Sequence, residues 1–268
     1  MRSRYLCLIL VLLTCNPLSA QDPARDSTGY FVSFDKTKIY YEDRGSGFPV
    51  VLVHGFINTG ETWKRTDLFK SLQEAGFRVI TLDLRGNGNS DKPHNAEGYA
   101  NDAEARDIIG LVSYLKINLY DVVGYSRGSI ITARLLVHDN RIRKAVIGGM
   151  GTDFTNPEWP RRIMFYRALS GDSIPELAGV VKYIKDSKLD QKALAMMQKE
   201  QPSTPMSILA KFNQPIFVVV GDADEDKDKA RELASIFPNA RYAIVPGDHS
   251  GAMRSKEFAS EVISFLRR

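Results

Sequence analysis

The segment best suited to carry chemistry is a serine set between two glycines. Residues 124–128 read Gly-Tyr-Ser-Arg-Gly, directly after an apolar run and directly before an amphipathic stretch. A turn this tight between a strand and a helix strains the serine backbone and pushes its hydroxyl out at the carboxyl end of a sheet. The first amides of the following helix face any anion that develops there. The pattern predicts Ser126 as a nucleophile, the alternative being an ordinary turn.

A serine hydroxyl needs a base to take its proton, and the chain holds four histidines. His249 follows an apolar run through Pro-Gly-Asp, which places it in a loop at a strand's carboxyl end and makes it the best candidate. It could otherwise be a surface loop histidine. We expect His138 to cap the helix after the serine, His94 to be solvated in a loop, and His54 to support its loop by hydrogen bonding.

The base in turn needs a carboxylate that fixes its tautomer and stabilises its charged form. The apolar run 216–220 leads into Gly-Asp-Ala-Asp, and we favour the last of these, Asp224. Asp222 and Asp226 compete for the role, and any of the three could be a solvated loop charge. Asp248 adjoins the histidine in sequence and is expected to point elsewhere.

A tetrahedral intermediate needs amide donors for its oxyanion. One candidate is the backbone N–H of Arg127, the residue after the serine. The other is that of Phe56, in the loop after the apolar run 50–53, where Gly55 lets the chain turn. The charged side chain of Arg127 must reach water or a carboxylate, or bind an acidic part of the substrate.

These residues need a scaffold of strands and helices to bring them together. Apolar runs that predict buried strands alternate with helical spacing, which is typical of parallel βαβ units. The runs are 50–53, 79–82, 120–123, 145–147, 216–220 and 242–245. Residues 30–34 and 38–42 predict a hairpin, and 63–72 one helix. Residues 152–213 lack a strand pattern, so we expect a helical cap there, a core of 30–151 and 214–268, and a loose lead-in at 21–29.

The first twenty residues have the order of a secretory signal peptide: two arginines, the apolar run 6–13, then small residues before Gln21. The run is too short for a stable membrane anchor, and the alternative is a buried helix. Cleavage after Ala20 would export the protein to the periplasm or beyond and remove both cysteines. Lipidation at Cys15 is the other outcome, because 12–15 loosely resembles a bacterial lipoprotein signal.

The charge balance argues against nucleic acid as a partner. The net charge is +4, and removing the two arginines of residues 1–20 leaves +2. No lysine- or arginine-rich run stands out. No feature of the sequence assigns an oligomeric state.

Together these motifs resemble the α/β-hydrolase fold family over about 30–268. The segments 54–56, 83–90, 124–128, 221–224 and 247–249 fall in the family's order, with serine, aspartate and histidine in sequence. The resemblance implies an eight-stranded, mostly parallel sheet with helices on both faces and a helical cap after the sixth strand. It also implies that 83–90 is a glycine-rich loop that shapes the site.

The same resemblance implies a serine hydrolase that cleaves a carboxylic ester or related acyl bond of a small molecule through an acyl-enzyme, with no metal or organic cofactor. Serine at position 126 argues against the dehalogenases and epoxide hydrolases of this fold, which carry aspartate there. Three alternatives stay open: an acyltransferase with the same triad, an amidase or aminopeptidase, and a non-catalytic binding protein on this scaffold.

Overall fold

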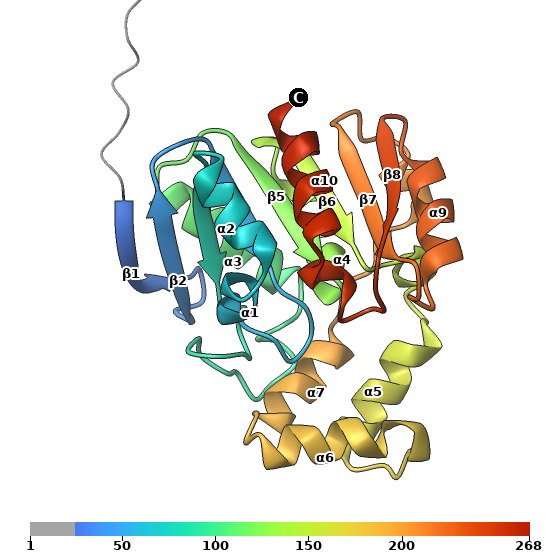
Figure 1. Ribbon diagram of the computed structural model, residues 1–268. Helices are drawn as coiled ribbons and strands as arrows, with labels where there is room; N and C mark the ends of the chain where they lie inside the picture. Colours follow the sequence, from blue (N-terminus) through green and yellow to red (C-terminus); the bar gives the residue numbers. More distant parts are fainter. Residues whose placement is uncertain (1–24) are drawn as a thin grey trace, which may run out of the picture.

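The protein is described here by a computed structural model that covers residues 25–268, so the predicted signal peptide and Cys15 lie outside the described residues. Eight strands form one sheet in the order β1-β2-β4-β3-β5-β6-β7-β8 (Figure 1). β2 runs antiparallel to β1 and β4, and the other pairs are parallel. This is the mostly parallel, eight-stranded sheet that the sequence predicted. The strands are β1 (Arg25–Val32), β2 (Lys38–Gly45), β3 (Pro49–Val53), β4 (Arg78–Leu82), β5 (Tyr120–Tyr125), β6 (Ile142–Gly148), β7 (Ile216–Gly221) and β8 (Ala240–Val245).

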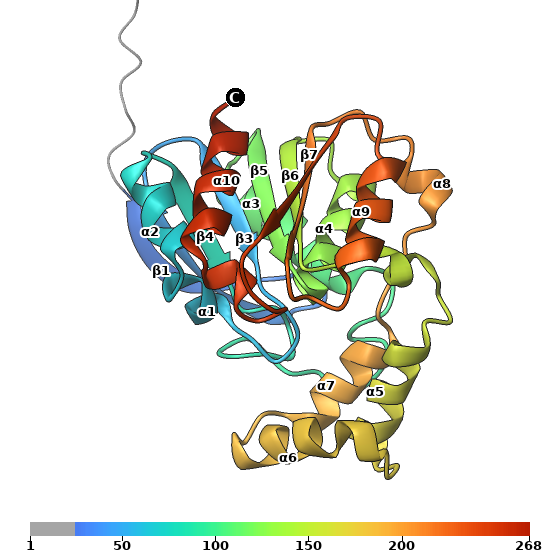
Figure 2. The same cartoon turned by 45° about the vertical axis from the view of Figure 1, so that its right-hand side comes forward.

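Helices cover both faces of the sheet (Figures 1 and 2). One face carries α1 (Gly60–Lys64), α2 (Asp67–Glu74) and α10 (Lys256–Arg267), and the other carries α3 (Ala103–Tyr114), α4 (Arg127–His138) and α9 (Lys227–Ile236). Alternate residues of each central strand enter the two cores: Val51 and Val53 pack on the α4 side, Val50 and Leu52 on the α10 side. A strand that is buried on both faces has a continuous run of apolar residues, which is why the sequence predicted these strands.

Two elements differ from expectation. The prediction of a loose lead-in at 21–29 was wrong for residues 25–29. Strand β1 begins at Arg25 and pairs with β2 from the Arg25–Gly45 register onward. Backbone pairing at a sheet edge needs no apolar side chains, so composition did not predict it. The helix expected at 63–72 is two helices, because Thr66 caps α2 by accepting a hydrogen bond from the backbone N–H of Phe69.

The chain between β6 and β7 holds short helices and, within residues 152–213, no strand. They are η1 (Thr152–Thr155), α5 (Pro160–Ser170), η2 (Pro175–Leu177), α6 (Ala178–Asp186), α7 (Gln191–Lys199) and α8 (Met206–Leu209). α5, α6 and α7, here called the cap, form a separate lobe beyond the carboxyl ends of the parallel strands (Figure 2). The cap has its own apolar cluster, which packs against Tyr99, Phe56 and Ile57 of the core loops. None of the helices in the described part of the chain has the length and apolar character needed to cross a membrane.

A buried arginine ties the loop after β4 to two other segments. The guanidinium of Arg85 donates to both carboxylate oxygens of Asp107 in α3, at 2.7 and 2.6 Å, and to Asp35 at 2.8 Å. The side chains of Arg85 and Asp107 are both fully buried. Such a pair must be kept complete, because either charge alone would be buried without compensation.

We therefore predict that Arg85→Met lowers the free energy of unfolding by about 3–5 kcal/mol. The control is Lys70→Met, which removes an exposed helix pair with Glu74 and should cost no more than about 0.5 kcal/mol. Urea unfolding of both variants measures the difference. Equal, small losses in the two variants would contradict the prediction.

Candidate active site

Ser126 sits on a strained turn between β5 and α4. Its φ is 54° and its ψ is −124°, a combination that favours glycine. Its flanking glycines allow this turn to close: a Cβ on Gly124 would lie 2.4 Å from the Gly128 carbonyl oxygen, and one on Gly128 would lie 2.1 Å from that of Val53. The turn lifts the Ser126 hydroxyl clear of the sheet at the N-terminus of α4.

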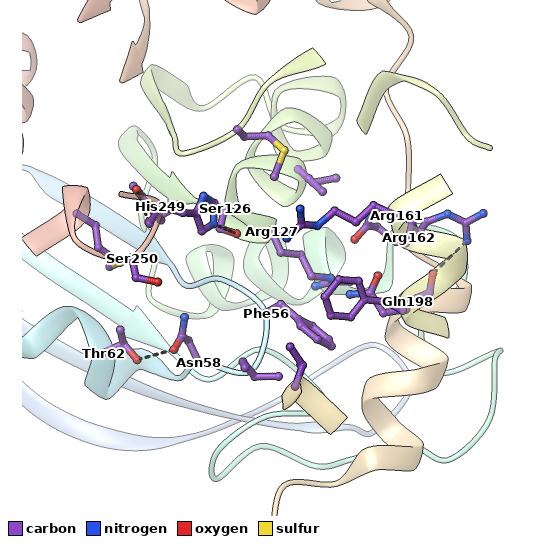
Figure 3. Close-up of a pocket in the computed structure, with 18 of the residues that line it drawn as sticks. Phe56, Asn58, Thr62, Ser126, Arg127, Arg161, Arg162, Gln198, His249 and Ser250 are labelled. Atoms are coloured by element: carbon purple, nitrogen blue, oxygen red, sulfur yellow. Dashed lines mark hydrogen bonds between the residues drawn. The ribbon is translucent and has the colours of Figure 1, made fainter. Parts of the chain in front are cut away.

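The hydroxyl begins a series of hydrogen bonds that the sequence predicted. Ser126 Oγ is 2.9 Å from His249 Nε2, and His249 Nδ1 is 2.9 Å from Asp224 Oδ2. Of the two competing carboxylates, Asp222 instead accepts from the backbone N–H of Gly247, while Asp226 lies in the turn beyond and donates its backbone N–H to Asp224. The structure thus brings together the three side chains that the sequence nominated. Figure 3 labels two of them, Ser126 and His249.

The Asp224 carboxyl is held in its charged form. Burial acts to raise its pKa, but the hydrogen bond from His249, that from the Asp226 amide and the charge of Arg161 leave the pKa below its usual value. A charged carboxylate on Nδ1 keeps the proton on that nitrogen. His249 Nε2 is then free to accept the proton of the Ser126 hydroxyl.

Tyr125 was not singled out from the sequence, yet it positions the histidine. Its buried hydroxyl donates to the backbone carbonyl of His249 at 2.8 Å. Tyr125, which precedes Ser126, therefore fixes the backbone of His249, whose ring faces the serine. No sequence signal marks this contact beyond the adjacency of Tyr125 to Ser126.

The loop that carries Phe56 borders the serine directly, since a Cβ on Gly55 would lie 3.2 Å from that of Ser126. His54 holds this loop as predicted. Its Nε2 accepts from the Leu84 N–H at 2.9 Å, which leaves the proton on Nδ1, 2.8 Å from the Gly55 carbonyl oxygen. Burial lowers the pKa of His54, so the ring stays neutral. Both predicted oxyanion residues, Phe56 and Arg127, line one cavity with Ser126.

The side chain of Arg127 reaches a carboxylate, one of the outcomes the sequence left open. Its two terminal nitrogens each lie 2.5 Å from an oxygen of Glu104, in the first turn of α3, and both side chains are 3% exposed. Glu104 was missed in the sequence. Asp107 lies on the same helix and is also buried, so no sequence signal distinguished Glu104.

The two remaining histidines lie away from Ser126. His94, expected to be solvated, is half-exposed and hydrogen-bonds to Asp190 at the start of α7, 2.8 Å away. His138 lies in the last turn of α4 with Nε2 2.7 Å from Asp102, which also binds Arg134. Neither histidine contacts the proposed nucleophile.

The serine opens into a cavity of about 310 Å³ between the core and the cap (Figure 3). Among the aromatic residues of this region, Trp159 and Phe165 line the cavity, whereas Trp63 and Tyr166 pack in apolar clusters. Polar lining comes from Asn58, Thr62, Gln198, Gln201, Ser250 and several arginines. Within residues 25–268 no group of three or more His, Cys, Asp or Glu residues is arranged to hold a metal ion.

The sequence profile of the alpha/beta hydrolase fold family matches residues 49–183, half of the chain. The chain belongs to this family. Over 111 residues it is 41% identical to a putative non-heme chloroperoxidase of Synechocystis sp., covering 41% of this chain and 39% of that protein. An epoxide hydrolase of Caballeronia sordidicola is 33% identical over 112 residues, 40% of this chain and 33% of that protein. The matches thus span less than half the length of these relatives.

Solved structures agree on the fold. A bromoperoxidase from Bacillus anthracis superposes with a TM-score of 0.71 at 26% identity, covering 90% of this chain and 100% of that one. An esterase from Exiguobacterium antarcticum gives a TM-score of 0.75 at 21% identity with the same coverage. The names of these proteins differ in chemistry, so they do not by themselves choose a reaction for this chain.

The backbone strain at Ser126 leads to a prediction about two variants that both lack the hydroxyl. Ser126→Gly should be more stable than Ser126→Ala by about 1 kcal/mol, because only glycine adopts this φ and ψ without strain. Urea unfolding compares them. The same pair at Ser129, inside α4, is the control and should show the opposite order, since glycine costs about 1 kcal/mol in a helix. Greater stability of Ser126→Ala would contradict the strain argument.

The buried Arg127–Glu104 pair generates a second prediction. Glu104→Leu alone should cost about 3–5 kcal/mol in the free energy of unfolding, because it leaves the guanidinium buried without its carboxylate. The double variant Glu104→Leu/Arg127→Met should recover most of that loss. Chemical denaturation of the two variants beside wild type tests this. A double variant no more stable than the single one would be inconsistent with the pair acting as a unit.

Proposed function

We propose that the protein is a serine hydrolase that cleaves carboxylic esters through an acyl-enzyme on Ser126. The observation that carries the proposal is the unbroken hydrogen-bonded series from Ser126 Oγ through His249 to Asp224, at 2.9 Å for each step. This is the arrangement that activates a hydroxyl for nucleophilic attack.

In the proposed mechanism, Ser126 Oγ attacks the ester carbonyl carbon while His249 Nε2 takes the hydroxyl proton. The amides of Phe56 and Arg127 donate to the oxyanion of the tetrahedral intermediate. The intermediate collapses, and the leaving alkoxide receives the proton from Nε2. Water then gives a proton to Nε2 and attacks the acyl carbon, and the second collapse returns the proton to Ser126 and releases the acid. Asp224 holds the histidine throughout.

The surroundings of the site favour hydrolysis over the alternatives. The His249 side chain is 44% exposed, so water can reach the acyl-enzyme, whereas acyl transfer needs a dry acceptor channel. An aminopeptidase would need an acidic anchor for the substrate's amino terminus, but the residues that line the cavity include no aspartate or glutamate. A pure binding protein would not need the strained serine, which costs stability.

The named relatives fit this proposal at the level of the family. Epoxide hydrolases of this fold resemble the chain in sequence, but serine in place of their aspartate favours acyl chemistry here. We also propose that the protein is exported after cleavage of residues 1–20, on the evidence of their charged, apolar and small-residue order. Cys15 remains an alternative lipidation site.

We predict that the purified protein hydrolyses short-chain 4-nitrophenyl esters and that Ser126→Ala lowers kcat/KM by about 10³-fold or more. Asp224→Asn should also lower it strongly, because the histidine would lose its tautomer control. Asp222→Asn and Asp226→Asn are matched controls from the same loop and should retain most activity. Circular dichroism checks that each variant is folded.

Equal activity in wild type and Ser126→Ala would contradict the proposed nucleophile. If no ester is turned over, a fluorophosphonate probe decides: labelling of wild type but not of Ser126→Ala supports a reactive serine. Absence of labelling in both would overturn the proposal.

A further inference from the structure

The cavity beside Ser126 is lined by positively charged side chains and by no negatively charged ones. Four arginines line it, namely Arg127, Arg161, Arg162 and Arg254, and the lining residues include no aspartate or glutamate. The rest of its wall is largely apolar, with Trp159 among the aromatic residues there. An apolar pocket with fixed positive charge and no internal counter-charge is suited to a substrate that brings a negative charge of its own.

The four arginines differ in whether a carboxylate balances their charge. Arg127 is neutralised by its two hydrogen bonds to Glu104. In contrast, within residues 25–268 no carboxylate oxygen lies within 4 Å of the guanidinium of Arg161, Arg162 or Arg254. None of these three guanidinium groups therefore has a carboxylate partner in the described part of the chain.

Arg161 and Arg162, which are neighbours in α5, point their side chains in different directions. Arg162 turns toward α7, where it donates to the backbone carbonyl oxygens of Gln198 and Lys199 at 3.1 and 2.8 Å (Figure 3). These contacts join two cap helices. Arg161 instead extends from α5 into the pocket, toward Ser126 and Arg127 (Figure 3).

Two arginines that line the cavity also have a buried side-chain nitrogen without a hydrogen-bond partner. Arg127 is almost fully buried, and its Nε has no hydrogen-bond partner among the described residues. The Nε of Arg162 is buried and lacks a partner in the same way. Buried donors are nearly always satisfied in folded proteins, so this wall retains hydrogen-bonding capacity that the described part of the chain does not use.

We propose that the pocket selects esters that carry a free carboxylate, and that Arg161 is the specificity-determining residue that binds this carboxylate. The inference rests on the Ser126-dependent hydrolysis proposed above. The planar guanidinium presents paired donors that match the two oxygens of a carboxylate. The Phe165 ring, 5.9 Å from the guanidinium carbon of Arg161, and Trp159 would contact the aliphatic chain between the carboxylate and the ester.

The first test compares two esters of the same acyl length, ethyl hydrogen glutarate and ethyl pentanoate, which differ in one terminal carboxylate. The ratio of their kcat/KM values should favour the acidic ester by about tenfold or more, mainly through KM, because a charge-assisted contact is made in both ground and transition states. The ratio should fall about tenfold in Arg161→Gln. Higher ionic strength should also lower it, since the guanidinium is exposed to solvent.

Arg167→Gln is the matched control. Arg167 lies on the same helix and pairs with Asp172 at the surface, outside the cavity. The substitution Arg167→Gln removes one positive charge from α5 without changing the pocket. The ratio of kcat/KM values for the two esters should therefore stay at its wild-type value. An equal fall in both variants would show a diffuse effect of net charge and would overturn the assignment to Arg161.

A binding measurement separates this inference from the proposed function. In Ser126→Ala, calorimetry should show ethyl hydrogen glutarate binding about tenfold more tightly than diethyl glutarate, and Arg161→Gln should abolish the difference. Ser126-dependent hydrolysis without preference for the acidic ester would overturn the inference and leave the hydrolase intact. If neither ester is hydrolysed, fluorophosphonate labelling tests the proposed function and binding alone decides the inference: selective binding supports the anionic subsite, and equal binding overturns it.

Discussion

The site depends on one backbone turn, that of Ser126, which only tight packing can hold. A side chain at this φ and ψ costs of order 1–3 kcal/mol, and the surrounding elements must offset it. Gly124 and Gly128 are what allow this, because the space their side chains would occupy is filled by the backbone of α4 and β3. The same close approach sets the Phe56 loop beside the serine, so the proposed nucleophile and the proposed oxyanion donors are positioned by a single packing arrangement.

The parallel sheet supplies the other partners at the same edge. Asp224 follows β7 and His249 follows β8, so the carboxyl ends of neighbouring strands supply the carboxylate and the proposed base without long connections. Tyr125 then closes the arrangement from the β5 side by holding the His249 backbone. Each of the three side chains is thereby fixed by an element that already belongs to the core.

Local patterns of the sequence were enough to predict the buried strands and the elements that carry Ser126, Asp224 and His249, because each follows a continuous apolar run. Features that depend on contacts between distant segments were not predictable. Residues 25–29 gave no strand signal, since an edge strand is held by backbone pairing. The partner of Arg127 lies 23 positions away, and nothing in the sequence distinguishes Glu104 from a surface carboxylate. The direction of the Arg161 side chain is likewise a property of the folded cap.

The depth at which an arginine lies decides what it does in this protein. Arg85 is fully buried and Arg127 almost fully, so both require carboxylate partners, which α3 supplies. Each of these ion pairs holds another segment of the chain against α3. Arg161 is exposed to solvent, so its charge is tolerated without a partner and remains available to a ligand. The cap that carries it contacts the loop of the proposed oxyanion donor, because Phe165 packs edge-on against Phe56 with 5.6 Å between ring centres.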